Sequence, residues 1–351
     1  MKKLGVGISL AIASLVLASL ATPAAAQPFG AWLVLSGPTN GYVEVAHNAA
    51  LNPASAITIE GWVAVTDPGG CSSIIGKNWT RAWWVGICGT TLRSYLFGWT
   101  GAGGTGTNRD AGKLSGFTHF AVVYDGTHRY HYINGELVGS WAETGALPGT
   151  TDPLRIGSDV QFNDTPHGAI NEIRLWDVAR TQAQIRQFIN VPITTAQPGL
   201  VAVWRDGMHD ALGHYTGTTH GSTGFLTFPA ILSCGTSSSS ALCLLSRWFV
   251  SMTYRIGAPG TAEANATTVP YYNPGSGLFY FNNPDDWQIL VKVLDGCAIN
   301  GHIWVGTAAS TNLFYRLTVT DAMGSAQKIY FNYPGPIAPS VLDTSAFSSC
   351  P

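Results

Sequence analysis

The chain consists largely of short segments in which apolar and polar residues alternate. Between residues 31 and 176 these segments are about five to nine residues long, and Gly, Asn, Asp or Pro stands in most of the gaps. A period of two between turn residues predicts antiparallel β-strands, and Asp125-Gly126 and Asn134-Gly135 indicate hairpin turns. The expected strands are 42–47, 57–65, 72–77, 82–87, 94–99, 118–126, 131–138, 153–157 and 168–176. Helical periodicity is nearly absent, although apolar residues three apart in 179–189 predict one short helix or turn.

The same alternation resumes after a Ser-rich stretch. The sequence "CGTSSSSALC" at 234–243 marks a boundary between two regions. Beyond it, the expected strands are 247–256, 277–283, 287–296, 301–308, 312–322 and 326–333. We therefore expect an all-β protein with a first β-sandwich domain at 27–229, a linker at 230–243 and a smaller β-sandwich at 244–351.

The first 26 residues have the features of a secretory signal peptide. Lys2 and Lys3 precede an apolar run, and Ala24–Ala26 provide small residues before a cleavage site. No later segment has 18 consecutive apolar residues, so we expect no membrane span in the mature chain. These features predict a secreted or extracellular protein, with the periplasm or the cell surface as other possible destinations.

Charge and cysteine content add to this interpretation. Only 11% of the residues are charged and the net charge is −2, which argues against nucleic acid as a partner. The six cysteines all follow the signal peptide, where disulfides persist. If residues 78–81 form a hairpin turn, Cys71 and Cys88 lie opposite each other within bridging range. Cys234 and Cys243 bracket the Ser-rich linker and are expected to pair, which leaves Cys297 and Cys350.

Five sequence segments carry a resemblance to a known family. "YVEV", "ITIEGWV", "FTHFAVVYDGTHRYHYINGELVG", "PLRIGSD" and "GAINEIRLWDVARTQAQI" resemble laminin G-like, concanavalin A-like jelly-roll domains in their order and spacing. The resemblance covers about residues 31–190 and implies two curved antiparallel sheets packed face to face. Bacterial relatives often carry a segment like 198–225 at the start of the domain. Here it follows the final strand, and it either adds an edge strand to the same sandwich or is the remnant of a second copy.

The C-terminal half is similar to a small β-sandwich found at the end of secreted bacterial proteins. The similarity depends on "LVKVLDGCAINGHIWV", "YRLTVTDAMGSAQKIYFN" and "DTSAFSSC". It implies no particular activity.

Two glutamates allow a catalytic interpretation. Alternation places Ile173 and Leu175 in the core and Glu172 with Arg174 on the opposite face, and Glu60 faces the same way on 57–63. A glycoside hydrolase would use Glu60 and Glu172 as its carboxylate pair. However, no Glu-x-Asp-x-x-Glu motif is present, and a neighbouring arginine lowers the pKa of a carboxylate and disfavours the general-acid role. The alternative is a cross-strand ion network with tryptophans beside it, and we expect no catalytic residues.

Aromatic residues gather around "NWTRAWWVGIC" and "YLFGWTGAGGTGTNRDAG". Trp79 is expected at a hairpin tip, and Trp99 opens a Gly-rich loop that leads to Asn108 and Asp110. Sugar sites combine an aromatic platform with fixed polar groups that bind hydroxyls. These four residues are therefore the candidate ligand-binding set at the rim of the sandwich. The alternative is that the tryptophans only fill or cap the sandwich.

Calcium is the metal that the resemblance implies, held by oxygen ligands from loops. Asp159, Asn163 and Asp164 in "GSDVQFND" are the candidate ligands, although turn chemistry explains such residues equally well. No cofactor is otherwise required. The sequence thus favours a secreted, non-catalytic recognition module for a glycan or glycosylated surface. The alternatives are a module that binds an extracellular or surface protein and, third, a glycoside hydrolase.

Overall fold

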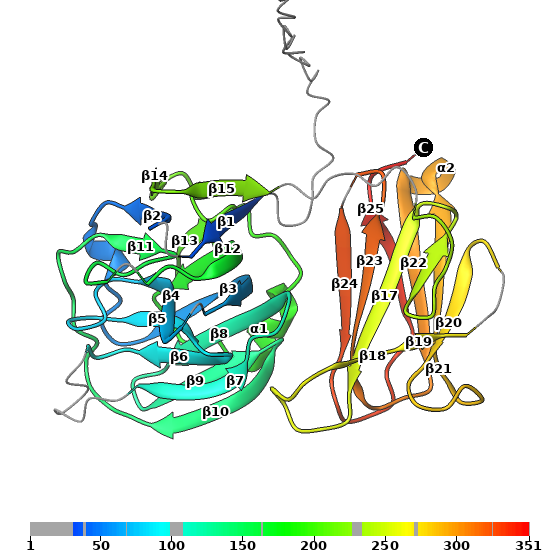
Figure 1. The fold of residues 1–351 in the computed structure, drawn as a ribbon, viewed down its shortest axis with the longest axis horizontal. Coiled ribbons are helices and arrows are strands. Elements are labelled where there is room, and N and C mark those ends of the chain that lie inside the picture. Colours follow the sequence, from blue (N-terminus) through cyan, green and yellow to red (C-terminus); the bar gives the residue numbers. More distant parts are fainter. Residues whose placement is uncertain are drawn as a thin grey trace, which may run out of the picture.

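The computed structural model describes residues 31–37, 40–67, 69–98, 108–162, 164–226, 234–269, 273–324 and 326–350. The predicted signal peptide, Trp99 and Asn163 lie outside these ranges. Within them, the strands pair antiparallel in four sheets, named A to D below (Figure 1). No helix in these ranges is long and apolar enough to cross a membrane.

Sheets A and B form the first sandwich. In spatial order, sheet A contains β10 (Glu136–Ala142), β9 (His128–Ile133), β8 (Thr118–Tyr124), β3 (Ile57–Thr66), β12 (His167–Trp176), β1 (Trp32–Ser36) and β15 (Thr223–Leu226), with β13 (Leu200–Trp204) also paired to β12. Sheet B contains β14 (Thr218–His220), β2 (Tyr42–Val45), β11 (Leu154–Ile156), β4 (Cys71–Gly76), β5 (Trp84–Cys88), β6 (Thr91–Tyr95) and β7 (Arg109–Lys113). The inward side chains of both sheets share one apolar core, so the expected all-β sandwich is confirmed.

The alternation read from the sequence sets the faces of the strands. On β3, Ile57, Ile59 and Val63 are fully buried in the core between the sheets, whereas Trp62 packs on the opposite face. The predicted strand at 82–87 is shifted to β5, and the one at 94–99 to β6. β5 starts later because the turn between β4 and β5 occupies residues 77–83 and is longer than a tight hairpin turn, whereas β6 starts earlier because only residues 89 and 90 separate it from β5. Asp110 lies in β7 rather than in the expected rim loop.

The segment 198–225 belongs to the first sandwich. Its first strand, β13, pairs with β12 in sheet A, and β15 pairs with β1 at the edge of the same sheet. Its middle strand, β14, pairs with β2 at the edge of sheet B. The segment therefore extends both sheets, which settles the alternative that the sequence left open.

Sheets C and D form the second sandwich around a separate apolar core. Sheet C contains β16 (Ala241–Leu244), β17 (Trp248–Arg255), β23 (Phe314–Asp321) and β24 (Gln327–Asn332), with β18 (Ala264–Asn265) paired to β17. Sheet D contains β19 (Thr267–Thr268), β20 (Ser276–Tyr280), β21 (Trp287–Gly296), β22 (His302–Ala309) and β25 (Val341–Phe347). The short helix α2 (Cys297–Asn300) connects β21 to β22, and a 3₁₀ turn, η1 (Ala49–Leu51), follows β2.

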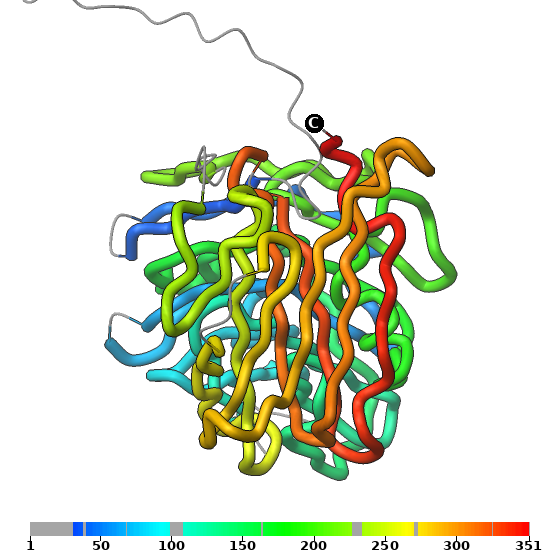
Figure 2. Tube along the Cα trace, turned by 90° about the vertical axis from the view of Figure 1, so that its right-hand side faces the viewer, coloured from blue at the N-terminus to red at the C-terminus, as the bar shows by residue number. Residues whose placement is uncertain are grey.

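The outer faces of sheets A and C meet through helix α1 (Gln182–Phe188), which lies between the two sandwiches (Figure 1). Ile189, just after α1, packs with Trp62 of sheet A and with Phe331 of sheet C. A buried ion pair between Arg255 and Glu136 also joins the two sandwiches, with a nitrogen–oxygen distance of 2.5 Å. Sheet D lies on the far side, toward the viewer in Figure 2. The layers therefore follow the order B, A, C, D, and the outer faces of B and D lie at the two ends.

Three disulfides connect the described cysteines in the expected pairs. They are Cys71–Cys88, Cys234–Cys243 and Cys297–Cys350. Cys71 and Cys88 are directly opposite each other on β4 and β5, as the hairpin argument required.

Candidate functional site

The outer face of sheet B carries a row of aromatic and polar side chains. On β5, Val85 and Ile87 point into the core, so Trp84 and Cys88 point outward. On β6, Leu92 points inward by the same alternation. The side chains that this register sends outward from the centre of the sheet are Cys71, Ser73, Trp84, Cys88, Arg93 and Tyr95.

Two loops extend this face. Trp79 lies in the turn between β4 and β5, where Asn78 adopts a left-handed conformation with φ of 84°. The backbone nitrogen of Trp79 donates to Oδ2 of Asp159 at 3.1 Å, which ties this turn to the loop after β11. Phe162 comes from that same loop, and its side chain is 56% exposed. Both loops thus bring an aromatic ring to the surface of sheet B.

These rings form a continuous cluster. The ring centroid of Trp79 lies 5.5 Å from that of Tyr95 and 5.7 Å from that of Phe162, and Trp84 lies 5.7 Å from Tyr95. Such separations are typical of interacting aromatic side chains. Together the residues surround a cleft of about 370 Å³, which is lined by Cys71, Trp79, Trp84, Tyr95, Phe162 and Asp164.

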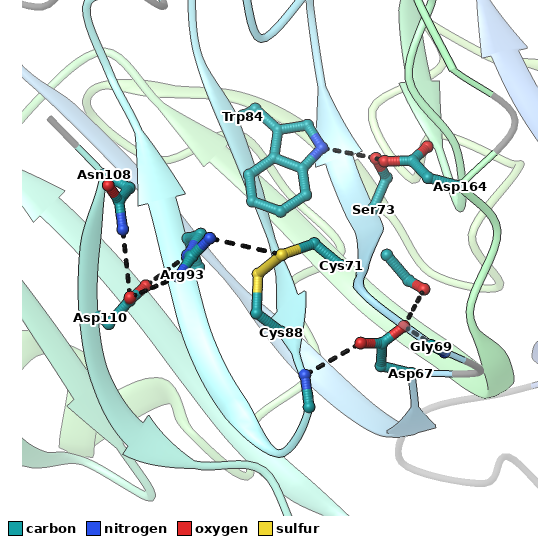
Figure 3. The surroundings of a disulfide bond; sticks show 12 residues. Asp67, Gly69, Cys71, Ser73, Trp84, Cys88, Arg93, Asn108, Asp110 and Asp164 are labelled. Carbon is teal, nitrogen blue, oxygen red and sulfur yellow. Dashed lines mark hydrogen bonds and ion pairs between the residues drawn. A yellow bond between two sulfur atoms is a disulfide. The ribbon is translucent and has the colours of Figure 1, made fainter. Parts of the chain in front are cut away.

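Asp164 is the carboxylate of this cleft. Its Oδ2 accepts a 2.6 Å hydrogen bond from Ser73 Oγ, and Ser73 Oγ in turn accepts from Trp84 Nε1 at 2.5 Å (Figure 3). Its Oδ1 accepts from the backbone nitrogen of Asp159 at 2.9 Å. Burial raises the pKa of Asp164 to about 6, and the nearby carboxylate of Asp159 acts in the same direction. The arrangement fixes Trp84 and the carboxylate relative to each other.

A second polar group lies beside the disulfide. Nε and Nη2 of Arg93 donate to the two carboxylate oxygens of Asp110, each at 2.6 Å, and Nδ2 of Asn108 donates to Asp110 at 3.1 Å (Figure 3). Nη1 of Arg93 also contacts Cys71 Sγ at 3.4 Å. Asn108 and Asp110 are therefore linked through Arg93 to Cys71, which lines the cleft, but neither lines the cleft itself and the Asp110 carboxylate is already bound by an arginine.

The sequence anticipated part of this site. Trp79 lines the cleft, whereas Trp99 lies outside the described residues. Trp84, Tyr95 and Phe162 were missed as site residues. For Trp84, the available signal was its alternation with Trp83, which is fully buried in the core. No local signal identified Phe162, because it reaches the cleft from a loop far away in the sequence.

The calcium candidates have other bonds in this structure. Asp159 is fully buried, and its carboxylate accepts from the backbone nitrogens of Trp79 and Gln161. Asp164 is bonded as described above, and Asn163 is outside the described residues. In the described ranges no group of three or more His, Cys, Asp or Glu side chains is arranged to hold a metal ion. Calcium binding stays a prediction of the sequence.

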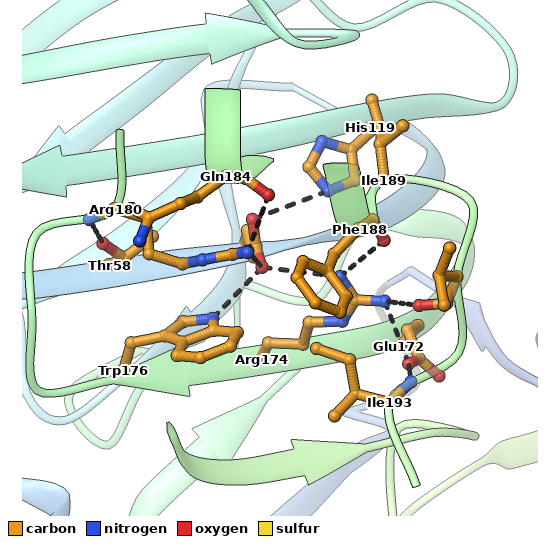
Figure 4. Close-up of polar contacts among 12 residues, drawn as sticks. Thr58, His119, Glu172, Arg174, Trp176, Arg180, Gln184, Phe188, Ile189 and Ile193 are labelled. Carbon is orange, nitrogen blue, oxygen red and sulfur yellow. Dashed lines mark hydrogen bonds and ion pairs between the residues drawn. The ribbon is translucent and has the colours of Figure 1, made fainter. Parts of the chain in front are cut away.

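Glu60 and Glu172 lie elsewhere, on the opposite sheet beneath the α1 segment. Both are fully buried. Arg174 donates to Glu60 at 3.4 Å and to Glu172 at 3.1 Å, and Arg180 donates to Glu60 at 2.5 Å (Figure 4). Trp176 Nε1 donates to Glu60 at 3.1 Å. The expected ion network with adjacent tryptophans is therefore present, and neither carboxylate of the hypothetical hydrolase pair is accessible to a sugar.

Two features of this network were not foreseen. Arg180 contributes a second guanidinium, and the ring of Trp176 lies 4.1 Å from it. The strand β12 is also irregular between Asn171 and Arg174, where Glu172 takes a φ of 50°. This bulge interrupts the simple alternation from which the faces were assigned.

The comparisons with known proteins agree with the fold. Residues 37–186 match the family described as the concanavalin A-like lectin/glucanases superfamily, of laminin G type. A search of curated proteins finds no match. Among solved structures, a candidate carbohydrate binding protein from Bacteroides ovatus is 21% identical, with 57% of this chain and 61% of that chain covered and a TM-score of 0.45.

Two further solved structures are similar to different shares of this chain. The CBM40 module of the IT-sialidase from Ruminococcus gnavus is 13% identical, with 44% of this chain and 95% of that chain covered and a TM-score of 0.36. The binding domain of botulinum neurotoxin DC is 10% identical, with 89% and 84% covered and a TM-score of 0.36. Likeness at this level carries no functional argument. The family match covers residues 37–186, which lie within the first sandwich.

Proposed function

We propose that this is a secreted, non-catalytic recognition protein that binds carbohydrate through the aromatic cleft on the outer face of sheet B. The observation that carries the proposal is the convergence of four aromatic rings and one carboxylate on a single cleft. The residues are Trp79, Trp84, Tyr95, Phe162 and Asp164.

The chemistry of the cleft suits a sugar. Aromatic faces pack against the C–H face of a pyranose ring, and a carboxylate accepts hydrogen bonds from hydroxyl groups. The volume of about 370 Å³ lies within the usual range of about 300–1,000 Å³ for small-molecule sites. The side chain of Phe162 is mostly exposed and gains burial when a ligand covers it.

The non-catalytic part of the proposal depends on the carboxylates. Hydrolysis of a glycosidic bond in most glycosidases needs two carboxyl groups on either side of the bond. Of the described residues that line the cleft, Asp164 is the only acid. Asp159, behind it, is fully buried and bonded to backbone nitrogens.

The test is a glycan panel measured by calorimetry and tryptophan fluorescence with the mature, oxidised protein. We expect saturable binding to at least one saccharide, and a loss of affinity of about tenfold or more in Phe162→Ala and Trp79→Ala. Trp287→Ala is the matched control, because Trp287 is an exposed tryptophan of sheet D with no contact to the cleft. Unchanged affinity in both cleft variants would refute this site. Loss of binding in Trp287→Ala alone would move the site to sheet D.

A further inference from the structure

The geometry points to a more specific ligand for the same cleft: a saccharide that carries a positively charged ammonium group, as on an amino sugar. The ammonium would lie among the aromatic rings, against the carboxylate of Asp164. This inference depends on the carbohydrate binding proposed above and adds the charge of the ligand to it.

The first argument is the number and kind of rings. A cation is attracted to the face of an aromatic ring when it lies within about 6 Å of the ring centroid, and several rings around one cation act together. The cleft is lined by four such rings, from Trp79, Trp84, Tyr95 and Phe162; Phe162 is the most exposed of them at 56%, and Trp84 is only 3% exposed. Phe162 has no polar atom, so the only attraction it offers beyond burial is that of its π-face.

The second argument is an excess of negative charge at the cleft. Among the described residues, neither Asp159 nor Asp164 forms an ion pair with a lysine or arginine. Two cationic side chains on this face already have carboxylate partners, although Arg155 also donates to the backbone carbonyl of Asp159 at 3.1 Å. Arg93 is paired with Asp110 at 2.6 Å, and Arg155 is paired with Glu44 at 2.9 Å.

The protonation behaviour of Asp164 agrees with this picture. Burial and the neighbouring carboxylate raise its pKa to about 6, because no adjacent cation stabilises the charged form. A bound ammonium group would supply that missing positive charge. The same ammonium could donate a hydrogen bond to Asp164, and such charge-assisted bonds are stronger than neutral ones.

The lining of the cleft argues for an organic cation rather than a metal ion. Calcium takes six to eight oxygen ligands, whereas the described lining provides one carboxylate and four aromatic rings. Rings bind alkylammonium groups through their faces but do not coordinate calcium. An ammonium on a sugar uses both parts of the cleft, because the sugar ring can stack while the amine meets the carboxylate.

The experiment compares three β-1,4-linked tetrasaccharides that differ only at carbon 2 of each sugar: glucose, N-acetylglucosamine and glucosamine. Affinities are measured by calorimetry at a pH slightly above 6, where more than half of Asp164 is ionised. We expect the glucosamine tetramer to bind about tenfold more tightly than the glucose tetramer. Asp164→Asn should reduce this ratio toward one, whereas Asp343→Asn, which removes a partly exposed, paired carboxylate from the second sandwich, should leave it unchanged. Equal affinities, or a ratio that persists in Asp164→Asn, would overturn the inference.

Tetramethylammonium provides a probe without a sugar. It should quench or shift the tryptophan fluorescence of the natural protein, and do so more weakly in Phe162→Ala. Because Phe162 is 56% exposed, this substitution should not disturb the fold, so a weaker response reports the loss of the ring. No response to tetramethylammonium, together with binding of neutral sugars, would overturn the charge preference and leave the carbohydrate proposal standing. A response to tetramethylammonium without binding of any saccharide would overturn the carbohydrate proposal. In that case a lysine side chain of a protein would become the ligand to test.

Discussion

Replacing Glu60 by Gln should destabilise the first sandwich far more than the loss of one surface charge. Glu60 is fully buried on β3 and accepts hydrogen bonds from Arg174, Arg180 and Trp176. Arg174 is itself only 1% exposed, and Arg180 4%. Removing the carboxylate charge takes away the carboxylate partner of Arg180 and leaves Arg174 with Glu172, which also pairs with Arg205.

The size of the effect follows from the burial of the partners. Breaking a buried ion pair by removing one partner typically costs about 3–5 kcal/mol, because the other charge stays buried without compensation. Gln keeps one acceptor oxygen for Trp176 or an arginine, so we expect the lower part of this range, about 3 kcal/mol. The matched control is Glu44→Gln. Its ion pair with Arg155 is partly exposed, and the expected loss is below about 1 kcal/mol.

The effect should also be local to the α1 segment. Nη1 and Nη2 of Arg174 donate to the backbone carbonyls of Phe188 and Val191, and Nη2 of Arg180 donates to the carbonyl of Gln184. When Glu60 no longer orients these arginines, the carbonyls lose well-placed donors. Amide hydrogen exchange in 181–193 should therefore accelerate more than exchange in β5, on the opposite sheet.

The assay is guanidinium unfolding of the oxidised protein, with hydrogen exchange followed by mass spectrometry. Glu60→Gln and Glu44→Gln are compared under the same conditions. A loss of less than about 1 kcal/mol in Glu60→Gln would refute the reasoning, since the arginines would then be compensated by groups other than Glu60. Equal acceleration of exchange in β5 and in α1 would refute the local part.

Three further predictions follow from particular contacts. The pKa of Asp164 is raised to about 6 from 3.8, so its contribution to stability is present at low pH and is lost as pH rises from about 4 to 6. When the pH is raised from about 4 to about 7, the change in unfolding free energy should therefore be more favourable to the folded state in Asp164→Asn than in the natural protein, by about 1–3 kcal/mol. Replacing both Cys71 and Cys88 by Ser should cost about 3 kcal/mol in guanidinium unfolding, because the disulfide closes a loop with a sequence separation of 17. Arg255→Ala removes the buried ion pair with Glu136 between the sandwiches. Calorimetry should then resolve two unfolding transitions, where the natural protein shows one. An unchanged profile would show that this pair does not couple the sandwiches.

The parts of the fold that the sequence predicts are those set by neighbours along the chain. Alternation alone places Ile57, Ile59 and Val63 on one face of β3 and Trp62 on the other, and the structure confirms both assignments. The pairing of Cys71 with Cys88 follows from the hairpin between β4 and β5, although the turn itself is longer than expected. These features depend on the backbone period and on turn residues, which short stretches of sequence contain.

Alternation identifies a face but not what covers that face. The same reasoning put Glu60 opposite the core without saying what covers it, whereas in the structure Arg174, Trp176 and Arg180 surround it and it is completely buried. The bulge at Glu172 has no signal in the sequence pattern. Phe162 and Asp164 reach the cleft from a loop about 80 residues beyond Trp79, and their approach depends on bonds such as the one from Trp79 to Asp159. Such convergence is a property of the folded chain.

The same distinction decides which face of the first sandwich can bind a ligand. Both outer faces carry tryptophans, with Trp62 and Trp176 on sheet A and Trp84 on sheet B, next to Trp79. On composition alone either set could be a sugar platform. Sheet A is excluded because Ile189 and Phe331 cover Trp62, and because Trp176 packs among Ile193, Val203 and neighbouring residues. The second sandwich covers Trp62 on sheet A and contributes no residue to the lining of the cleft, whereas on the outer face of sheet B the ring of Phe162 stays exposed.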